Sequence, residues 1–289
     1  MNNRLLILGG GFGIYGYLPA ALKANWNVAT LSRYKADLNA RVELSNLVHQ
    51  VSFVDENNLD PNSYDAVVVA RTPQQQVNFI RANPSFSGHL FLEKPLGDSV
   101  NATTEVLDFL EFHKLRFSIA YLFQYQDWYQ KIFLKRHSGY KVMIDWRITP
   151  NVNQNWKNEI GAGGGVLSYY GVHLLSLIID CEYSLGDLII KYDPNCLEVT
   201  STNLQRPLNV KLSIDKTAAF KVDLDNHSNG YHWSGISPFG IKPTAGLPDP
   251  RVPALIRYLS DEERHQNLVE SISKERKILE FRQTIFNLL

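Results

Sequence analysis

Short apolar runs alternate with longer, mixed stretches along the first 120 residues of the chain. The runs suit buried strands and lie at residues 5–8, 27–31, 51–54, 65–70, 89–92 and 117–121. The stretches between them suit helices, which we expect at residues 14–24, 35–48, 76–82 and 101–113. Strands that alternate with helices in this way predict an α/β fold built on a doubly wound parallel sheet.

The second half of the chain has a different pattern. Residues 141–149 suit a strand that leads into this half, and apolar and polar residues alternate at residues 187–192, 196–202, 209–214 and 218–223. Such alternation is typical of a sheet with one covered face. A long final helix is expected at residues 261–287, with Leu268, Ile272 and Leu279 among its apolar positions. We therefore predict two domains, residues 1–120 and residues 121–289.

A stretch rich in proline and glycine lies before the final helix, at residues 234–253. Loops of this length are usually lids over functional sites, interface arms or disordered segments. We expect an ordered arm near the functional site or near a partner subunit.

The composition excludes several classes of protein. Lysine plus arginine and aspartate plus glutamate both number 29, so no excess charge indicates nucleic acid or an anionic membrane as a partner. No stretch approaches the roughly 20 apolar residues of a membrane helix, and the first apolar run is too short for a signal peptide. Two cysteines, Cys181 and Cys196, form no disulfide framework, so we expect a cytoplasmic protein. No histidine or cysteine spacing indicates a metal site.

A cluster of glycines follows the first apolar run, directly before an expected helix. This order is that of the dinucleotide-binding motif, in which glycine permits a tight turn and lets backbone N–H groups approach a pyrophosphate. Gly11-x-Gly13-x-x-Gly16 fits the pattern literally, whereas Gly9-x-Gly11 lies at the strand end but places Ile14 third. We favour the second frame for phosphate contact, and a merely flexible turn is the alternative.

The second strand ends at Ser32 and Arg33, about 20 residues after the glycine turn. Sites that prefer NAD place an aspartate or glutamate here to bind the ribose 2′-hydroxyl. A small hydroxyl followed by arginine suits the 2′-phosphate of NADP instead, because guanidinium pairs with phosphate and no carboxylate repels it. We therefore expect a preference for NADP(H), with NAD(H) as the second candidate. A solvated loop arginine is the other interpretation of Arg33.

Three motifs resemble the Gfo/Idh/MocA oxidoreductases, a family named for glucose-fructose oxidoreductase and inositol dehydrogenase. They are the glycine turn followed by Leu18-Pro19-Ala20, the tripeptide Glu93-Lys94-Pro95, and the segment Gly163-Gly164-Gly165-Val166-Leu167-Ser168-Tyr169-Tyr170-Gly171-Val172-His173. Their order and spacing match the family over about residues 4–180. The resemblance implies a Rossmann domain followed by an α+β domain with an open, largely antiparallel sheet. The bare face of that sheet commonly joins subunits, which implies a homodimer or homotetramer.

The turn motifs and the resemblance together assign a set of residues to the cofactor. They are Gly9, Gly11, Phe12, Gly13, Ser32, Arg33, Arg71, Thr72, Pro73, Glu93 and Lys94. Lys94 stands at the carboxyl end of a predicted strand, where open α/β sheets bind ligands. The resemblance makes it the catalytic lysine that contacts the substrate oxygen, and its ammonium would polarise a carbonyl. A surface lysine before a proline turn is the alternative.

The glycine-rich segment opens a helix expected at residues 166–179, on which Tyr169, His173 and Ser176 share one face. A lone helical histidine is more often structural, but the resemblance makes His173 the residue that transfers a proton. Substrate contacts are assigned to Tyr121, Trp156, Tyr169 and His173. For Trp156, stacking on a sugar ring and packing in the core are both open.

Tyr169 departs from the family pattern, which usually has aspartate four residues before the histidine. A phenol donates a hydrogen bond and is a candidate acid, unlike a carboxylate. The departure leaves three alternatives: a ketoreductase that uses a tyrosine acid, a weakened enzyme, or a binding protein.

These observations predict an NADP(H)-dependent oxidoreductase that acts on a sugar, a sugar derivative or a nucleotide-linked sugar. Hydride would pass between nicotinamide and a carbinol or carbonyl carbon. A non-catalytic dinucleotide-binding sensor or scaffold of the same fold is the alternative. A reductase of another planar substrate, as in the related biliverdin reductases, is disfavoured by Lys94.

Overall fold

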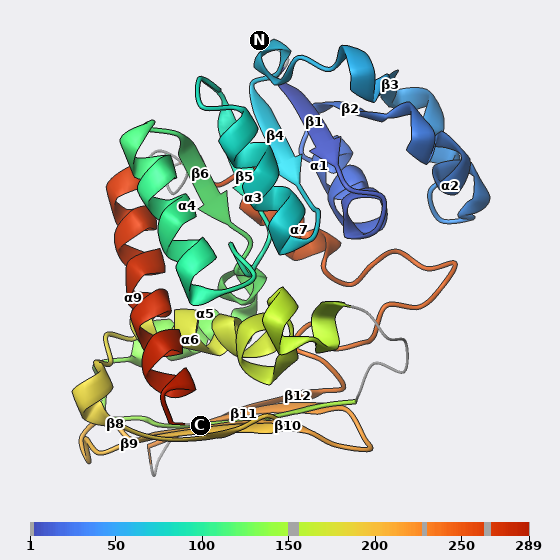
Figure 1. Cartoon of the computed structure of the whole chain (residues 1–289). Coiled ribbons are helices and arrows are strands. Elements are labelled where there is room, and N and C mark those ends of the chain that lie inside the picture. Colours follow the sequence, from blue (N-terminus) through green and yellow to red (C-terminus); the bar gives the residue numbers. More distant parts are fainter. Residues whose placement is uncertain (1–2, 150–155, 227–229, 263–266, 289) are drawn as a thin grey trace. The chain divides into compact units, whose positions relative to one another are not determined.

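The computed structural model describes residues 3–149, 156–226, 230–262 and 267–288, and the chain divides into two compact units (Figure 1). Unit 1 comprises Met1–Gly97, Asn101–Leu122 and Pro243–Ser273. Unit 2 comprises Asp98–Val100, Phe123–Lys242 and Lys274–Leu289. Each unit has its own six-stranded sheet.

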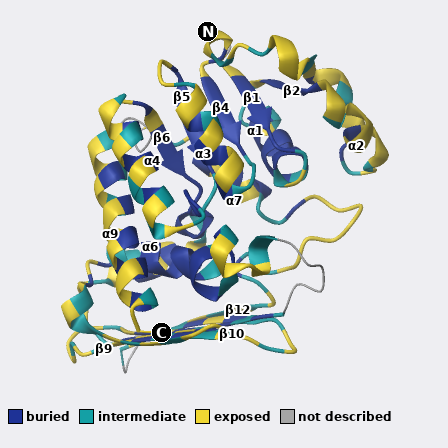
Figure 2. Ribbon diagram, viewed as in Figure 1, coloured by how far each residue is buried: buried dark blue, intermediate teal, exposed yellow. Residues whose placement is uncertain are grey.

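The sheet of unit 1 is parallel throughout and has the strand order β3-β2-β1-β4-β5-β6 (Figure 1). Its strands are β1 (Arg4–Leu8), β2 (Asn27–Leu31), β3 (Ser52–Val54), β4 (Ala66–Val69), β5 (His89–Leu92) and β6 (Arg116–Ile119). Strands β4 and β5 are buried along their whole length, as strands covered on both faces should be (Figure 2). The predicted doubly wound sheet is confirmed, and its order is that of dinucleotide-binding folds.

The helices of unit 1 follow the prediction less closely than its strands do. They are α1 (Leu18–Lys23), preceded by a π-helix at Gly13–Tyr17, then α2 (Lys35–Ala40), α3 (Pro73–Ala82), α4 (Val100–Phe112) and α7 (Val252–Leu259). The helix expected at residues 35–48 is broken, because α2 ends before Arg41, which is extended, and a 3₁₀ helix follows at Ser45–Gln50. Leu38 alone is buried within α2, so little packing extends that helix.

The structure divides the chain differently from the predicted boundary at residue 120, because residues 243–273 return to unit 1. Helix α7 lies within this segment and was not predicted. It packs against α1 through a buried apolar face. The Tyr258 hydroxyl donates to the Ser118 carbonyl oxygen at 2.9 Å, and its ring lies 5.3 Å from that of Phe91. The apolar face of α7 therefore completes the core of unit 1.

The sheet of unit 2 has the order β12-β11-β7-β10-β9-β8 and is antiparallel except between β7 and β10. Its strands are β7 (Lys141–Ile148), β8 (Leu188–Asp193), β9 (Cys196–Ser201), β10 (Leu208–Ile214), β11 (Ala219–Asp225) and β12 (Tyr231–Gly235). The largely antiparallel sheet is confirmed, and β12 is an addition to the predicted strands.

The core of unit 2 lies on one face of this sheet. Side chains of the sheet pack there with those of α5 (Asp127–Lys135), α6 (Val172–Asp180) and part of α9 (Leu268–Phe286). The run Ile160–Asp180 is long and apolar enough to cross a membrane by length and composition alone, contrary to the expectation that no stretch approaches that length. Its apolar window is 72% buried inside the fold, and core helices pass the same test.

The other face of the unit 2 sheet is polar. Lys211 pairs with Glu198 at 2.7 Å, and His232 lies 2.6 Å from Asp223. Met143 and Ile189 are the exposed large apolar side chains described among these polar residues. Permanent subunit interfaces are usually more apolar than this face. The homodimer or homotetramer therefore stays a prediction without support from surface composition.

Candidate functional site

The geometry of the glycine turn after β1 fits the second of the two frames. Gly9 has φ +150°, and a Cβ built on it would lie 2.1 Å from the Ala70 carbonyl oxygen. A Cβ on Gly11 would meet nothing within 4 Å. Glycine at position 9 thus lets two strand ends approach, whereas position 11 leaves its backbone open to a ligand. The third glycine of the literal frame, Gly16, instead accommodates the Phe12 ring.

The helix after this turn begins at Gly13, whose missing side chain allows close packing. A Cβ there would lie 3.2 Å from Ile7 Cγ2. The amide of Ile14 donates to the Gly11 carbonyl oxygen at 2.9 Å, which starts the helical turn. A glycine turn that leads into a helix in this way fits the pyrophosphate of a dinucleotide.

Arg251 was not among the predicted site residues, and it lies against this turn. Its guanidinium carbon is 3.9 Å from the centre of the Phe12 ring. Asp249, which is 5% exposed, accepts from Arg251 Nε at 2.9 Å and from its Nη2 at 2.8 Å. The proline- and glycine-rich segment thus ends as an ordered structure that places a cation beside the turn. The only signal in the sequence was an arginine within a stretch rich in turn residues.

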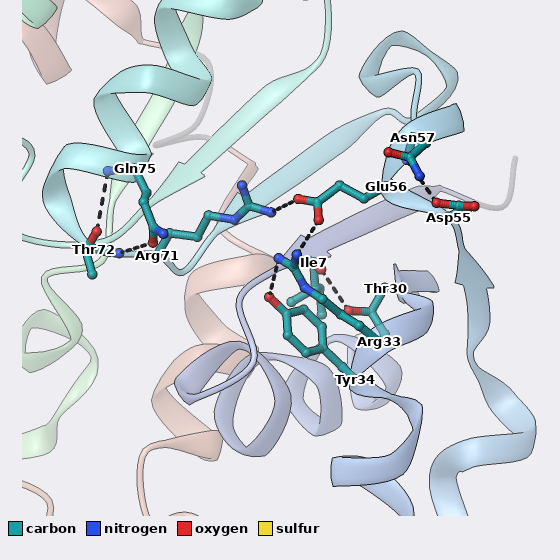
Figure 3. Close-up of polar contacts among 10 residues, drawn as sticks. All are labelled: Ile7, Thr30, Arg33, Tyr34, Asp55, Glu56, Asn57, Arg71, Thr72 and Gln75. Carbon is teal, nitrogen blue, oxygen red and sulfur yellow. Dashed lines mark hydrogen bonds and ion pairs between the residues drawn. The ribbon is translucent and has the colours of Figure 1, made fainter.

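Arg33, Glu56 and Arg71 form an ion-paired cluster at the carboxyl edge of the unit 1 sheet (Figure 3). They follow β2, β3 and β4, respectively. One carboxylate oxygen of Glu56 pairs with Arg33, and the other lies 2.9 Å from Arg71 Nη2. The expectation that no carboxylate lies near Arg33 is therefore wrong. Glu56 was missed because it stands 23 residues further along the chain, after a different strand.

Arg33 also contacts the next residue, Tyr34. Its Nη2 donates to the Tyr34 hydroxyl at 3.1 Å, and this hydrogen bond raises the pKa of Arg33. The Tyr34 ring in turn covers Gly10, since a Cβ built there would lie 2.6 Å from it. Arg33 and Tyr34 belong to a short 3₁₀ helix, Ser32–Tyr34, which begins at Ser32. Tyr34 thus packs against the glycine turn, whereas the Arg33 side chain is half exposed, so both interpretations of Arg33 stay open.

Thr72 and Pro73 start helix α3. The Gln75 amide donates to Thr72 Oγ1 at 3.4 Å, and the Thr72 amide donates to Gln75 Oε1 at 3.4 Å (Figure 3). Pro73 occupies the first helical turn, where its missing N–H costs no hydrogen bond. Both residues therefore have a structural role next to Arg71, and a direct cofactor contact by either stays a prediction.

The tripeptide Glu93-Lys94-Pro95 follows β5 and is held by Gln76, which lies on α3. The fully buried Gln76 amide accepts from the Glu93 N–H at 2.8 Å and donates to the Glu93 carbonyl oxygen at 2.9 Å. It also donates to the carbonyl oxygen of Leu96 at 3.2 Å. One side chain thus fixes both ends of the turn that carries Lys94. The Lys94–Pro95 peptide is cis.

Glu93 also receives a hydrogen bond from the helix after the glycine turn. The Tyr17 hydroxyl donates to Glu93 Oε1 at 2.6 Å. Burial, and then the nearby Glu93, raise the pKa of the Tyr17 phenol well above its ordinary value. The phenol therefore remains a donor, and it joins the cofactor turn to the tripeptide.

In unit 2, Tyr169 and Trp156 are in contact. Their ring centres lie 5.4 Å apart in an edge-to-face arrangement. Lys157 places its ammonium 5.2 Å from the Tyr169 ring centre. Tyr170 lies 4.8 Å from Tyr169, and burial raises the pKa of Tyr170 to about 12. Two of the predicted substrate residues thus form one aromatic corner with an adjacent cation.

His173 lies on α6 and is 7% exposed. Its ring stacks on Phe123, with centres 4.3 Å apart and planes 15° from parallel. Phe123 belongs to an aromatic core that includes Trp146. Tyr121, assigned to substrate, is 5% exposed in unit 1. Both side chains have little free surface in this conformation.

The structure groups the predicted residues into two sets. The glycine turn, the arginines and Lys94 belong to unit 1, whereas Trp156, Tyr169 and His173 belong to unit 2. A single site that includes Lys94 and His173 stays a prediction. Within the described residues, no group of three or more histidine, cysteine, aspartate or glutamate side chains could hold a metal ion.

Comparison with known proteins supports the fold. No family model and no curated protein matches the chain. Among solved structures, a myo-inositol dehydrogenase from Corynebacterium glutamicum aligns with a TM-score of 0.72 and 10% identity, over 99% of this chain and 96% of the other. The chain has the fold of the Gfo/Idh/MocA oxidoreductases. The resemblance is therefore confirmed for the fold, since identity this low shows nothing finer.

Two further solved structures show how varied this fold is in function. KijD10, a 3-ketoreductase from Actinomadura kijaniata in complex with NADP and TDP-benzene, has a TM-score of 0.65 and 13% identity, over 96% of this chain and 95% of the other. A super-repressor mutant of Gal80p from Saccharomyces cerevisiae has a TM-score of 0.69 and 12% identity, over 100% and 97%. Because a repressor shares the fold, function has to be argued from the site.

Proposed function

We propose that this protein is an NAD(P)(H)-dependent oxidoreductase that acts on a sugar, a sugar derivative or a nucleotide-linked sugar, with NADP(H) preferred. The hydrogen bond from Tyr17 to Glu93 carries the proposal. It joins the helix that follows the glycine turn to the turn that holds Lys94, at the carboxyl edge of a parallel sheet. Ligands of open α/β sheets bind at this edge.

The charges in unit 1 support an anionic dinucleotide as cofactor. Arg251 lies over Phe12, and Arg41 lies over the Tyr15 ring, 4.9 Å from its centre. Arg33 and Arg71 stand after β2 and β4. Together with the open backbone at Gly11, these side chains would hold the phosphates. Solved structures of this fold hold NAD or NADP.

The chain's own residues would divide the chemistry between them. A bound nicotinamide supplies or accepts the hydride. The Lys94 ammonium would polarise the substrate oxygen and stabilise negative charge as it develops there. His173 and the Tyr169 phenol would then move the proton to or from that oxygen.

The aromatic corner of Trp156 and Tyr169 supports a sugar-like substrate. Flat aromatic rings with a nearby cation suit a sugar ring that carries a charged or phosphorylated group. Lys157 is that cation. KijD10, of the same fold, holds TDP-benzene, and another structure of this fold holds UDP-GlcNAcA.

A screen of keto-sugars and nucleotide-linked keto-sugars with NADPH, followed by absorbance of the reduced nicotinamide, tests the proposal. We expect turnover with at least one substrate by the wild-type protein and loss of turnover in Lys94→Ala. Glu105→Gln, which changes an exposed ion pair of unit 1, is the control. Absence of cofactor binding would contradict the proposal outright.

A non-catalytic dinucleotide sensor is the second candidate, and Tyr169 favours it. The family resemblance places an aspartate at this position, and here the ring is engaged with Trp156 and Tyr170. The Gal80p structure shows that a repressor shares the fold. Tight cofactor binding without turnover across the screen would support this candidate over the enzyme.

A further inference from the structure

Glu56 occupies the position between two arginines at the end of the sheet where the cofactor ribose is expected. Each of its carboxylate oxygens faces a different guanidinium, Arg33 on one side and Arg71 on the other (Figure 3). One carboxylate therefore bridges the two guanidinium groups. The cluster carries two positive charges and one negative charge.

This arrangement matches a phosphate better than it matches a carboxylate. A phosphate monoester carries about −1.5 to −2 charges near pH 7 and offers three acceptor oxygens, whereas a carboxylate carries one charge and two oxygens. Two arginines at this spacing can each donate to a different phosphate oxygen. Glu56 thus stands where the 2′-phosphate of NADP would satisfy both arginines.

The position of Glu56 allows its side chain to move without disturbing the fold. Its side chain is 42% exposed, and it begins a three-residue 3₁₀ helix, Glu56–Asn58. That helix is capped independently by Asp55, whose carboxylate accepts from the Asn57 amide at 3.0 Å. The carboxylate of Glu56 can therefore leave the arginines while the backbone stays in place.

We propose that Glu56 is a specificity-determining residue that restrains the preference for NADP(H), because its carboxylate competes with the 2′-phosphate for Arg33 and Arg71. The inference rests on the proposed function of this edge as the cofactor site. A 2′-phosphate that binds has to displace Glu56 or lie beside it. NAD(H), which has only a hydroxyl at this position, meets no such repulsion.

Binding measurements on Glu56→Gln test the proposal without turnover. Glutamine keeps the size of the side chain and removes its charge. We expect NADPH to bind Glu56→Gln about three- to tenfold more tightly than it binds the wild type, as Coulomb repulsion between partly exposed charges implies. NADH affinity should change less than twofold. Titration calorimetry or nicotinamide fluorescence measures both.

Two probes separate this effect from the rest of the cofactor. Adenosine 2′,5′-bisphosphate contains the 2′-phosphate without nicotinamide, and it should gain affinity as NADPH does, whereas 5′-AMP should not. The gain should shrink at about 1 M salt, where the screening length is only about 3 Å. Glu105→Gln, which loses a carboxylate paired with Arg81 at 2.5 Å on the surface of the same unit, should leave every affinity unchanged.

The outcomes distinguish this inference from the proposed function. Wild-type protein that binds neither dinucleotide contradicts both. Wild-type protein that binds them, with an unchanged NADPH-to-NADH affinity ratio in Glu56→Gln, contradicts this inference alone. Weaker NADPH binding in Glu56→Gln also overturns it, because Glu56 would then be orienting the arginines for the phosphate. Glu56→Ala repeats the test with a side chain that makes no contact with either arginine.

Discussion

The Tyr17 hydroxyl donates to Glu93 Oε1 at 2.6 Å, across 76 positions of the chain. Tyr17 is fully buried in the helix after the glycine turn, and Glu93 begins the tripeptide that carries Lys94. The bond therefore links the motif expected to hold the cofactor to the motif expected to act on the substrate. Neither motif alone indicates such a link.

Removal of this bond should destabilise unit 1. Tyr17→Phe removes the hydrogen bond that the Tyr17 hydroxyl donates to the partly buried Glu93 carboxylate, so we expect a loss of about 1–3 kcal/mol in the free energy of unfolding. Urea unfolding followed by circular dichroism measures it. Tyr64→Phe is a matched control, because the described contact of that buried tyrosine, with Arg4, is made by its ring. Equal effects of both substitutions would show that the hydroxyl of Tyr17 contributes nothing specific.

The burial of Tyr17, together with the nearby Glu93, gives a pH dependence of stability with a defined sign. The pKa of Tyr17 is raised in the folded protein above about 10, its ordinary value, so the folded state binds this proton more tightly than the unfolded chain. Its contribution to stability is complete below pH 10 and is lost as the pH rises from there towards the folded pKa. Tyr17→Phe should therefore lose less stability than the wild type between about pH 10 and 11.

Gln76 should position Lys94 through the backbone. Gln76→Met keeps the bulk of the side chain but leaves the Glu93 amide and two carbonyl groups without their partner. We expect a loss of about 1–3 kcal/mol in stability and a fall in kcat that exceeds any change in cofactor Kd. The control is Gln74→Met. In the part of the chain that the structure describes, the exposed amide of Gln74 contacts only Asn78. A Gln76→Met protein with wild-type kcat would show that Lys94 does not depend on this clamp.

Sequence patterns predicted the central strands of the unit 1 sheet well because these strands are buried on both faces. In β1 and β4, for example, the fully buried residues include Leu5, Leu6, Val67, Val68 and Val69. Such strands carry an apolar signal that depends little on their neighbours. The glycine turn was predictable for a related reason, because its backbone geometry limits which residues fit.

Features that depend on distant contacts were not predictable. Glu56 is an ordinary surface glutamate in the sequence, and only the strand order brings it between Arg33 and Arg71. Helix α7 begins at Val252, at the end of the stretch rich in proline and glycine, and no helix was predicted for the residues that follow it. The same stretch concealed Arg251, whose position depends on Asp249 and Phe12.

Arg33 should matter more for NADPH than for NADH. Arg33→Ala removes one of the two guanidinium groups that would face a 2′-phosphate, so we expect NADPH binding to weaken about 5- to 20-fold at low salt, with NADH affected less than twofold. The expected loss of NADPH affinity is modest because the Arg33 side chain is half exposed. Arg81→Ala, from the Arg81–Glu105 surface pair, is the control. An equal loss for both cofactors, or a native preference for NADH, would contradict the assignment.

Substitutions of the proposed catalytic residues should affect kcat more than they affect the binding of the cofactor. On a verified substrate, Lys94→Ala and His173→Ala should lower kcat more than cofactor affinity, and His173→Ala by about 10²- to 10⁴-fold if it transfers a proton. Tyr169→Phe should lower kcat if the phenol is a donor, and should have no effect if the ring only fills space beside Trp156. His232→Ala, an exposed histidine of unit 2, is the control. Unchanged turnover in both Lys94→Ala and His173→Ala would rule out their roles.

The most direct test of the account is dinucleotide binding to Gly11→Val. A Cβ built at this position meets no atom beyond its chain neighbours within 4 Å, so we expect the fold to be retained, with a melting temperature close to that of the wild type. The valine side chain would project into the space where the pyrophosphate of the cofactor is expected to approach the protein backbone. Gly186→Ala, at a glycine outside the site, controls for the loss of glycine itself. We expect NADPH and NADH to bind the wild type and the control, and to bind folded Gly11→Val at least tenfold more weakly. Wild-type affinity in folded Gly11→Val would contradict this expectation.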